Sequence, residues 1–224
     1  MFVFVTGIDT NVGKTIITGL LAKYLLSIGK SVITAKLVET GNTEGVSQDV
    51  TLHRILMDME LNFMDYNNDT CPQLFQLAAS PHLAAKMENS EIDIELITNK
   101  LFNLQDQYEI VLVEGAGGLF VPLKGRYTIF DYIQESYSPV VVVSTNKLGS
   151  INHTLLTVNH LISSMVQVVG IVYNKIYNES ELITNDTEQY LREYYPNIPV
   201  IPLEKINIEK PPLIDFSEIF SNLL

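Results

Sequence analysis

The stretch GIDTNVGKT, from Gly7 to Thr15, has the composition of a loop that holds phosphate. It follows the apolar run FVFVT and precedes an amphipathic run, so it lies where a strand turns into a helix. At such a turn, backbone N–H groups and the helix N-terminus point at one anion. Lys14 would add charge on the outer phosphates, and the Thr15 hydroxyl would ligate magnesium. The stretch therefore predicts a nucleotide phosphate site.

The spacing of this loop departs from the common phosphate-loop pattern. Residues 8–12 separate Gly7 from Gly13, which is one residue more than the standard motif has, and Ile8 takes the place of the usual first glycine. The alternative is a chance Gly-Lys-Thr at an ordinary helix start. The buried strand before the loop and the helical spacing of apolar residues after it favour the phosphate loop.

Three charged residues elsewhere could act on a bound nucleotide. Glu114 ends the apolar run IVLVE and precedes GAGG, and a strand-end acid in a protein with a phosphate loop is where a magnesium-binding carboxylate is expected. Asp49 could supply a second carboxylate, although acids near a helix N-terminus are common for dipole reasons alone. Lys36 ends another apolar run, where its charge faces either an anion or solvent. Both alternatives stay open for Asp49 and Lys36.

The histidines and the single cysteine suggest no further chemistry. Cys71 excludes an internal disulfide and a thiolate cluster, and its polar surroundings lack the features of an activated nucleophile. No two histidines have the spacing of a metal pair on one face, so the sequence assigns no chemistry to any of the four: His53, His82, His153 and His160.

The composition limits the possible partners. The chain has 14 basic and 26 acidic residues and a formal net charge of −12, which disfavours nucleic acid or an anionic membrane surface as a partner. No apolar run reaches the roughly 18 residues of a membrane span, and no basic region precedes the apolar start as in a signal peptide. We expect a cytoplasmic chain whose 224 residues form one domain, residues 1–224.

Short apolar runs alternate with helical patterns along the chain. Strands are predicted at Phe2–Thr6, Ser31–Lys36, Glu109–Gly115, Pro139–Thr145 and Val168–Asn174. Helices are predicted at Lys14–Ile28, Gln48–Met57, Asp93–Asp106, Ile129–Glu135, Ile151–Met165 and Glu181–Tyr194. This alternation predicts an α/β fold, a doubly wound, mainly parallel sheet with helices on both faces, of the P-loop NTPase type. The polar segment Glu60–Ser90 is expected to be a surface excursion of loops.

Five motifs follow one another along the chain: GIDTNVGKT, AKLVETG, SPHLAA, VEGAGGLFVPL and NKLGSINHTLLT. The run VEGAGG followed by V-P-L, together with KLGSINH, is more specific than any phosphate loop. In the order and spacing of these motifs, from about Phe2 to Asn174, the chain resembles the dethiobiotin synthetase family. The resemblance implies a homodimeric enzyme that uses ATP and Mg²⁺ to carboxylate 7,8-diaminopelargonate with carbon dioxide and to close the ureido ring of dethiobiotin.

The resemblance also implies roles for individual residues. ATP would be bound by Asp9, Thr10, Asn11, Val12, Gly13, Lys14 and Thr15, with Asn174 at the adenine. Magnesium would be held by Thr15, Asp49 and Glu114. Lys36 and Thr40 would face the carbamate and the transferred phosphate, so the catalytic set is Lys14, Lys36 and Thr10. The substrate carboxylate would be received from the partner subunit by the helix start Gly149, Ser150, Ile151 and Asn152, which suits free helix amides.

The chain departs from the family pattern at three places. Leu37 follows Lys36 where the family has proline, and Asn11 stands where an acid is common. The stretch Glu204–Asn207 replaces a Gly-x-Ile-Pro run beside the base, which leaves the base selectivity open.

Two other classes of protein have related phosphate loops. Cobyrinate amidating enzymes have related loops but usually carry a glutaminase portion with a reactive cysteine, and this chain has only Cys71. A partner-binding switch ATPase commonly has a second lysine near the start of the loop, where this chain has Ile8, Asp9, Thr10 and Asn11. An enzyme that joins groups through acyl phosphate chemistry needs no covalent nucleophile, and the sequence offers none.

Overall fold

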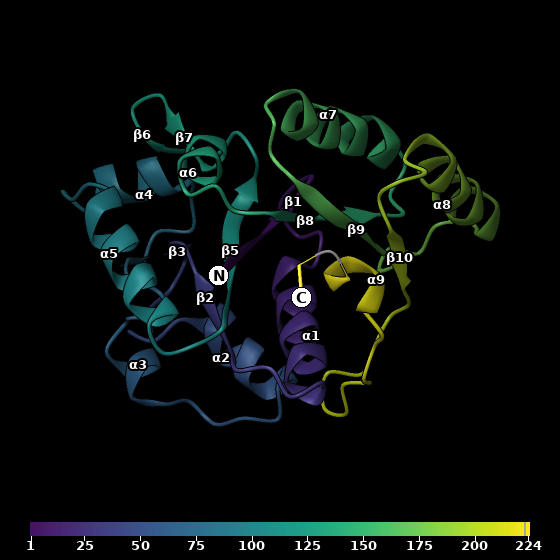
Figure 1. The fold of residues 1–224 in the computed structure, drawn as a ribbon. Helices are drawn as coiled ribbons and strands as arrows, with labels where there is room; N and C mark the ends of the chain where they lie inside the picture. The colour runs from purple at the N-terminus through teal and green to yellow at the C-terminus, as the bar shows by residue number, and fades with distance from the viewer. Residues whose placement is uncertain (222) are drawn as a thin grey trace.

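A six-stranded parallel sheet runs through the middle of the protein (Figure 1). The computed structural model describes residues 1–221 and 223–224. The strands lie in the order β10-β9-β8-β1-β5-β2, and every neighbouring pair is parallel. Their bounds are β1 (Phe2–Gly7), β2 (Val32–Lys36), β5 (Ile110–Gly118), β8 (Val140–Thr145), β9 (Val168–Asn174) and β10 (Val200–Leu203).

Helices cover both faces of this sheet, as the sequence predicts (Figure 1). One face packs against α1 (Lys14–Ser27), α2 (Gln48–Leu56) and the short α9 (Ser217–Phe220). The other packs against α5 (Ile94–Gln105), α6 (Ile129–Glu135), α7 (Ser150–Ser163) and α8 (Glu181–Tyr194). Within the described residues, none of these helices combines the length and apolarity that crossing a bilayer requires.

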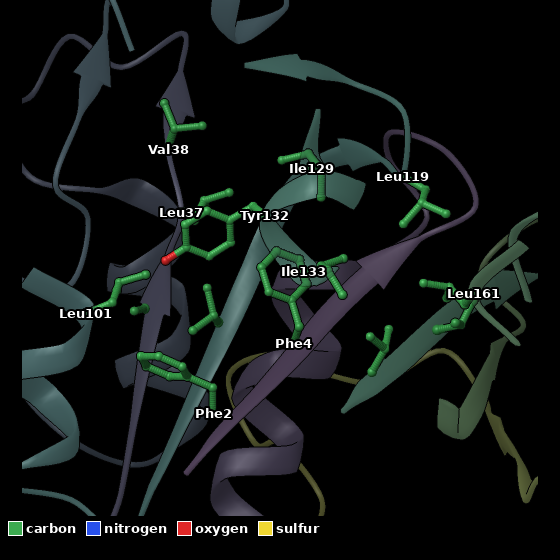
Figure 2. Close-up of a cluster of buried hydrophobic side chains, with 14 of the residues drawn as sticks. Phe2, Phe4, Leu37, Val38, Leu101, Leu119, Ile129, Tyr132, Ile133 and Leu161 are labelled. Carbon is green, nitrogen blue, oxygen red and sulfur yellow. The ribbon is translucent and has the colours of Figure 1, made fainter. Parts of the chain in front are cut away.

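The alternation of side chains along β1 divides the core into two layers. Phe2 and Phe4 point to the face covered by α5, α6 and α7, where they join the cluster in Figure 2. Val3 and Val5 point to the face covered by α1. Because side chains alternate across a strand, a central strand must be apolar at every position, and this explains the unbroken run FVFVT.

The strand order creates a crevice at the end of β1. From β1 the chain goes out to the edge strand β2, returns to β5 beside β1, and later crosses to β8 on the other side of β1. In doubly wound sheets, ligands bind outside the carboxyl ends of the strands where the connections diverge in this way. The loop Gly7–Thr15 leaves β1 at this point.

The five predicted strands are confirmed, but the sheet has a sixth strand that the sequence pattern did not predict. β10 is four residues long and contains Pro202, with Pro199 just before it. It pairs only with β9, at the edge of the sheet. Proline is tolerated there because one side of an edge strand needs no ladder hydrogen bonds.

The segment from Glu60 to Ser90 is more regular than a set of loops. It contains α3 (Phe63–Tyr66), β4 (Leu74–Phe75) and α4 (Pro81–Met87), and β4 pairs with β3 (Glu39–Thr40) beyond the end of β2. A second small pair follows β5, formed by β6 (Pro122–Lys124) and β7 (Tyr127–Thr128).

A buried ion pair attaches this segment to the main domain. Arg54 of α2 donates from Nη2 to Asp65 Oδ1 at 2.7 Å and from Nε to Oδ2 at 3.0 Å. The Arg54 Nη1 group donates to Thr34 Oγ1 of β2 at 2.7 Å, and the Thr70 hydroxyl donates to Asp65 Oδ1 at 2.8 Å. Arg54 and Asp65 are both buried and share two hydrogen bonds, and Arg54 also contacts β2. The ion pair therefore fixes the segment Glu60–Ser90 beside β2.

We predict that Asp65→Asn lowers the free energy of unfolding by about 3–5 kcal/mol, because it leaves the Arg54 charge buried without its partner. The matched control is Asp58→Asn, since Asp58 pairs with Lys23 but its side chain is 68% exposed; this change should cost about 1 kcal/mol or less. Urea unfolding of the two variants measures the difference. Equal shifts of the two midpoints would contradict the anchoring role of the buried pair.

Candidate active site

A cleft of about 500 Å³ opens at the carboxyl ends of β1, β2 and β5. Most of the residues predicted for the phosphate and metal site line it, namely Thr10, Asn11, Gly13, Lys14, Thr15, Lys36, Thr40, Asp49 and Glu114. Val38, Glu39, Ala116, Gly117 and Ile176 complete much of the wall. The loop after β1, the end of β2, the start of α2 and the end of β5 therefore meet around one space.

The phosphate loop needs a glycine at its last turn before α1. Gly13 has a φ of 95°, and a Cβ added there would lie 2.2 Å from Nδ2 of Asn174. No side chain caps the start of α1, so its first N–H groups remain available to an anion. The backbone is thus shaped to cradle phosphate before any ligand contact is made.

Lys14 lies inside the cleft, where burial disfavours its charge. Its Nζ donates to the backbone oxygen of Asp9 at 2.9 Å, which curls the side chain over the loop. Burial, with the repulsion of the Lys36 ammonium, lowers the pKa of Lys14 to about 8. An anion bound in the loop would stabilise the charged form of Lys14 and raise its pKa.

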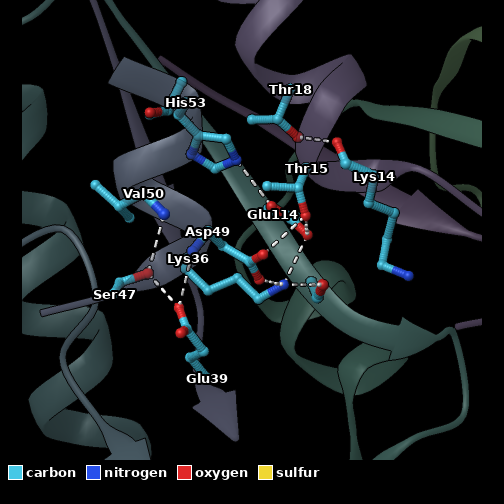
Figure 3. Close-up of polar contacts among 12 residues, drawn as sticks. Lys14, Thr15, Thr18, Lys36, Glu39, Ser47, Asp49, Val50, His53 and Glu114 are labelled. Atoms are coloured by element: carbon cyan, nitrogen blue, oxygen red, sulfur yellow. Dashed lines mark hydrogen bonds and ion pairs between the residues drawn. The ribbon is translucent and has the colours of Figure 1, made fainter. Parts of the chain in front are cut away.

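Lys36 bridges two carboxylates at the centre of the site (Figure 3). Its Nζ lies 2.6 Å from Asp49 Oδ2 and 2.6 Å from Glu114 Oε1, and it also donates to the backbone oxygen of Gly115 at 3.3 Å. Burial opposes the charge on Lys36, but the two carboxylates outweigh it and raise the pKa of Lys36. Burial likewise opposes ionisation of Glu114, yet the Lys36 ammonium and a hydrogen bond from His53 lower its pKa to about 2. The strand-end lysine faces anions rather than solvent.

Thr15 lies against the same two carboxylates. Its Oγ1 is 2.9 Å from Asp49 Oδ1 and 3.1 Å from Glu114 Oε1. One hydroxyl and two carboxylates are hard oxygen donors of the kind that Mg²⁺ prefers. Among the described residues no group of three His, Cys, Asp or Glu side chains could hold a metal ion. The donor set here fits an ion that takes its remaining ligands from nucleotide phosphates and water.

Glu39 was not among the residues predicted for the site, and its carboxylate organises the start of α2. It accepts a hydrogen bond from the Ser47 hydroxyl, and from the backbone N–H groups of Gln48 at 3.0 Å and Asp49 at 3.3 Å. Asn42 donates to the same carboxylate at 2.8 Å. Because these bonds satisfy free helix amides, Glu39 fixes the turn that presents Asp49 to the cleft.

His53 is a second residue of the site that the sequence did not indicate. The sequence assigned no chemistry to His53, and the structure places its Nε2 2.9 Å from Glu114 Oε2, with the ring fully buried. The available signal was its position four residues after Asp49, which places both side chains on one face of α2. A search for histidine pairs cannot detect such a contact.

The residues predicted to contact the substrate carboxylate and the base lie outside the main cleft of this chain, as do two of the predicted ATP contacts, Asp9 and Val12. Asp9, Val12 and Ser150 line a separate cavity of about 110 Å³, and Gly149, with a φ of 96°, precedes α7. Of the remaining predicted helix-start residues, Ile151 is half-buried and Asn152 is exposed. Asn174 is buried behind the phosphate loop and donates from Nδ2 to the Val12 backbone oxygen at 2.9 Å. The roles of these residues toward substrate carboxylate and adenine stay predictions.

Comparison with known proteins adds independent findings. Residues 2–203 match a family described as an AAA domain. The chain is 42% identical over 207 residues to the ATP-dependent dethiobiotin synthetase BioD 2 of Haemophilus ducreyi, which covers 91% of this chain and 98% of that protein. It is also 42% identical over 213 residues to the ATP-dependent dethiobiotin synthetase BioD of Chlorobaculum tepidum, with 93% and 89% covered.

Similar solved structures agree on the fold. The structure of pNOB8 ParA bound to nonspecific DNA matches with a TM-score of 0.54 and 16% identity, covering 99% of this chain and 91% of that one. The signal recognition particle receptor FtsY from Elizabethkingia anophelis matches with a TM-score of 0.52 and 12% identity, covering 98% of this chain and 64% of that one. At such identities the likeness shows the fold alone.

We predict that ATP binding at about pH 9 takes up close to one proton per site. The free Lys14 side chain, with a pKa of about 8, is mostly neutral at that pH, and bound phosphates favour its charged form. At about pH 7 the side chain is already charged, so the uptake should be small. Titration calorimetry in buffers of different ionisation enthalpy measures the uptake. It should vanish in Lys14→Met and persist in the control Lys124→Met; equal uptake in all three proteins would contradict the assignment.

Proposed function

Because the chain belongs to the family of ATP-dependent dethiobiotin synthetases, we propose that its phosphate-loop cleft carries out the carboxylation and ring closure of 7,8-diaminopelargonate. The chain is an enzyme, a ligase of biotin biosynthesis that uses ATP. The observation that supports assigning the reaction to this cleft is the meeting of Lys14, Thr15, Lys36, Asp49 and Glu114 around one space beside the free N-terminus of α1.

The proposed reaction has three steps. One amine of the substrate adds to carbon dioxide and loses a proton, giving a carbamate. A carbamate oxygen then attacks the γ-phosphorus of ATP in line, so ADP leaves and a carbamic phosphoric anhydride forms. The second amine attacks the carbonyl carbon of this anhydride, phosphate leaves, and the cyclic urea closes. No covalent enzyme intermediate is required, and Cys71, whose thiol pKa is raised by burial, is poorly suited to be a nucleophile.

The protein would contribute positioning and charge. The free N–H groups of the loop and the Lys14 ammonium would hold the outer phosphates, with the exposed Thr10 beside them. Lys36 and Thr40 also line the cleft, where they would neutralise and orient the carbamate and the transferred phosphoryl group. Interactions of this kind accelerate phosphoryl transfer when they strengthen in the transition state.

Magnesium is proposed to bind at Thr15, Asp49 and Glu114, where the Thr15 hydroxyl oxygen lies within hydrogen-bond distance of one oxygen of each carboxylate. When bound with ATP, the ion neutralises charge on the outer phosphates. Lys36 occupies the position between the two carboxylates, which indicates that this point attracts positive charge. Glu39 accepts from the Asp49 N–H and so fixes the position of this proposed metal ligand.

We further propose that the enzyme is a cytoplasmic homodimer with shared active sites. The start of α7, from Gly149 to Asn152, has no side-chain cap and lies outside the cleft of its own chain. The Ser150 N–H donates to the Lys147 backbone oxygen at 2.9 Å, so a carboxylate would be received by the N–H groups of Ile151 and Asn152. A carboxylate bound there would meet the phosphate loop of a partner subunit across a two-fold axis. ATP and bicarbonate are both available in the cytoplasm.

We predict that the chain converts 7,8-diaminopelargonate to a cyclic urea in the presence of ATP, Mg²⁺ and bicarbonate, as detected by mass analysis of the products.

Lys36→Gln should lower kcat by roughly 10² while changing nucleotide affinity less, because the charge of Lys36 acts on the reacting groups. The control is Lys124→Gln, at an exposed lysine outside the cleft. ATP turnover without the diamine would instead indicate a switch ATPase, and a Lys36→Gln loss confined to nucleotide binding would assign Lys36 to ATP alone.

We predict that two inactive variants restore activity when mixed. Lys14→Ala removes the phosphate contact, and Asn152→Trp places a bulky side chain over the first turn of α7. If sites are shared across a two-fold axis, random mixing makes half of the dimers mixed, and one site in each is intact, so about a quarter of the wild-type activity should return. Native mass measurement of tagged chains confirms subunit exchange. Mixed dimers that form and stay inactive would show that each chain builds its site alone.

A further inference from the structure

The two carboxylate oxygens of Glu114 have different environments (Figure 3). Oε1 faces the cleft, where it accepts from Lys36 at 2.6 Å and lies 3.1 Å from Thr15 Oγ1. Oε2 faces the interior and lies 2.9 Å from His53 Nε2. The side chain is buried, so each oxygen depends on the protein for its hydrogen bonds.

The His53 ring is held in one tautomer by its neighbours. An ionised carboxylate can only accept, so the hydrogen of the His53–Glu114 contact is on Nε2. Nδ1 is buried and has no hydrogen-bond partner, and a hydrogen there would be an unsatisfied buried donor. His53 therefore donates from Nε2 to Glu114 Oε2.

Close packing of α2 on α1 fixes the helix that carries this buried ring. At Gly19 the two helices approach so closely that an added Cβ would lie 2.7 Å from Leu56 Cβ and 3.3 Å from His53 Cα. His53 is one helical turn after Asp49, so α2 brings one carboxylate to the cleft and a fixed donor to the other. A donor whose rotamer is fixed by packing can also fix the group that accepts from it.

We propose that His53 is a positioning residue that holds Oε2 of Glu114 and so keeps Oε1 directed into the cleft for cation binding. Without this donor, Oε2 would be a buried acceptor with no partner, and the carboxylate would turn to share the partners that Oε1 has in the cleft. Support of this kind for a metal ligand is typically worth 10- to 100-fold, as an order of magnitude, in metal affinity. The inference rests on the proposed role of Glu114 in holding magnesium.

The test is Mn²⁺ affinity of the ADP-bound enzyme, measured by electron paramagnetic resonance without turnover. His53→Leu keeps the apolar volume and removes the donor, so Mn²⁺ affinity should fall by about 10- to 100-fold. His53→Gln places an amide Nε2 at a similar reach and should recover most of the affinity, whereas His53→Asn is too short and should not. His82→Leu, at an exposed histidine on α4, is the matched control and should change nothing.

Two comparisons separate the failure of this inference from the failure of the proposed site. If Glu114→Gln leaves Mn²⁺ affinity unchanged, the assignment of Glu114 as a metal ligand is wrong. If Glu114→Gln weakens binding while His53→Leu does not, the positioning role of His53 is overturned. Equal losses in His53→Gln and His53→Asn would mean that the ring acts through packing alone, which also contradicts the proposal. Should His53→Leu fail to fold, the Gln and Asn variants carry the test by themselves.

Discussion

The Lys36 ammonium is buried between the carboxylates of Asp49 and Glu114, at 2.6 Å from each. Three charges at such distances are stable in a low-dielectric site only when their geometry is fixed. The parallel pairing of β2 with β5 sets Lys36 opposite Glu114, and α2 brings Asp49 to both. The cleft of this strongly acidic chain thus contains a buried lysine ammonium paired with two carboxylates.

Much of the surrounding structure serves to hold this arrangement. Glu39 accepts hydrogen bonds at the start of α2 and so fixes Asp49. His53 contacts Oε2 of Glu114, the oxygen that points away from the cleft. The close approach of α1 and α2 at Gly19 accompanies the contacts of Thr15 with one oxygen of Glu114 and of His53 with the other. The site is therefore set by the packing of two helices on a sheet edge as much as by its own polar contacts. Phosphoryl transfer depends on such preorganisation, because the protein supplies position and charge rather than a nucleophile.

The sequence predicted the parts of the fold and site that have local signals. The apolar run before GIDTNVGKT and the strand-end acid Glu114 indicated where phosphate and metal would bind, and the structure brings Lys14, Thr15, Asp49 and Glu114 together as expected. β10 was missed because a four-residue edge strand with Pro202 has no distinctive pattern. The role of His53 depends on which face of α2 meets β5, and the role of Glu39 depends on a turn closing back on β3. Tertiary contacts of that kind leave no periodic signal in one sequence.

We propose that Thr15, Asp49 and Glu114 hold the nucleotide's metal ion at the point where Lys36 bridges the carboxylates. Anomalous diffraction from crystals grown with Mn²⁺ and a non-hydrolysable ATP analogue can locate the ion. We expect one metal peak in the cleft, with Thr15 Oγ1 and at least one oxygen from each carboxylate as direct ligands, and with the Lys36 ammonium moved toward the γ-phosphate. A metal bound by the phosphates alone, with Lys36 still between Asp49 and Glu114, would contradict this proposal.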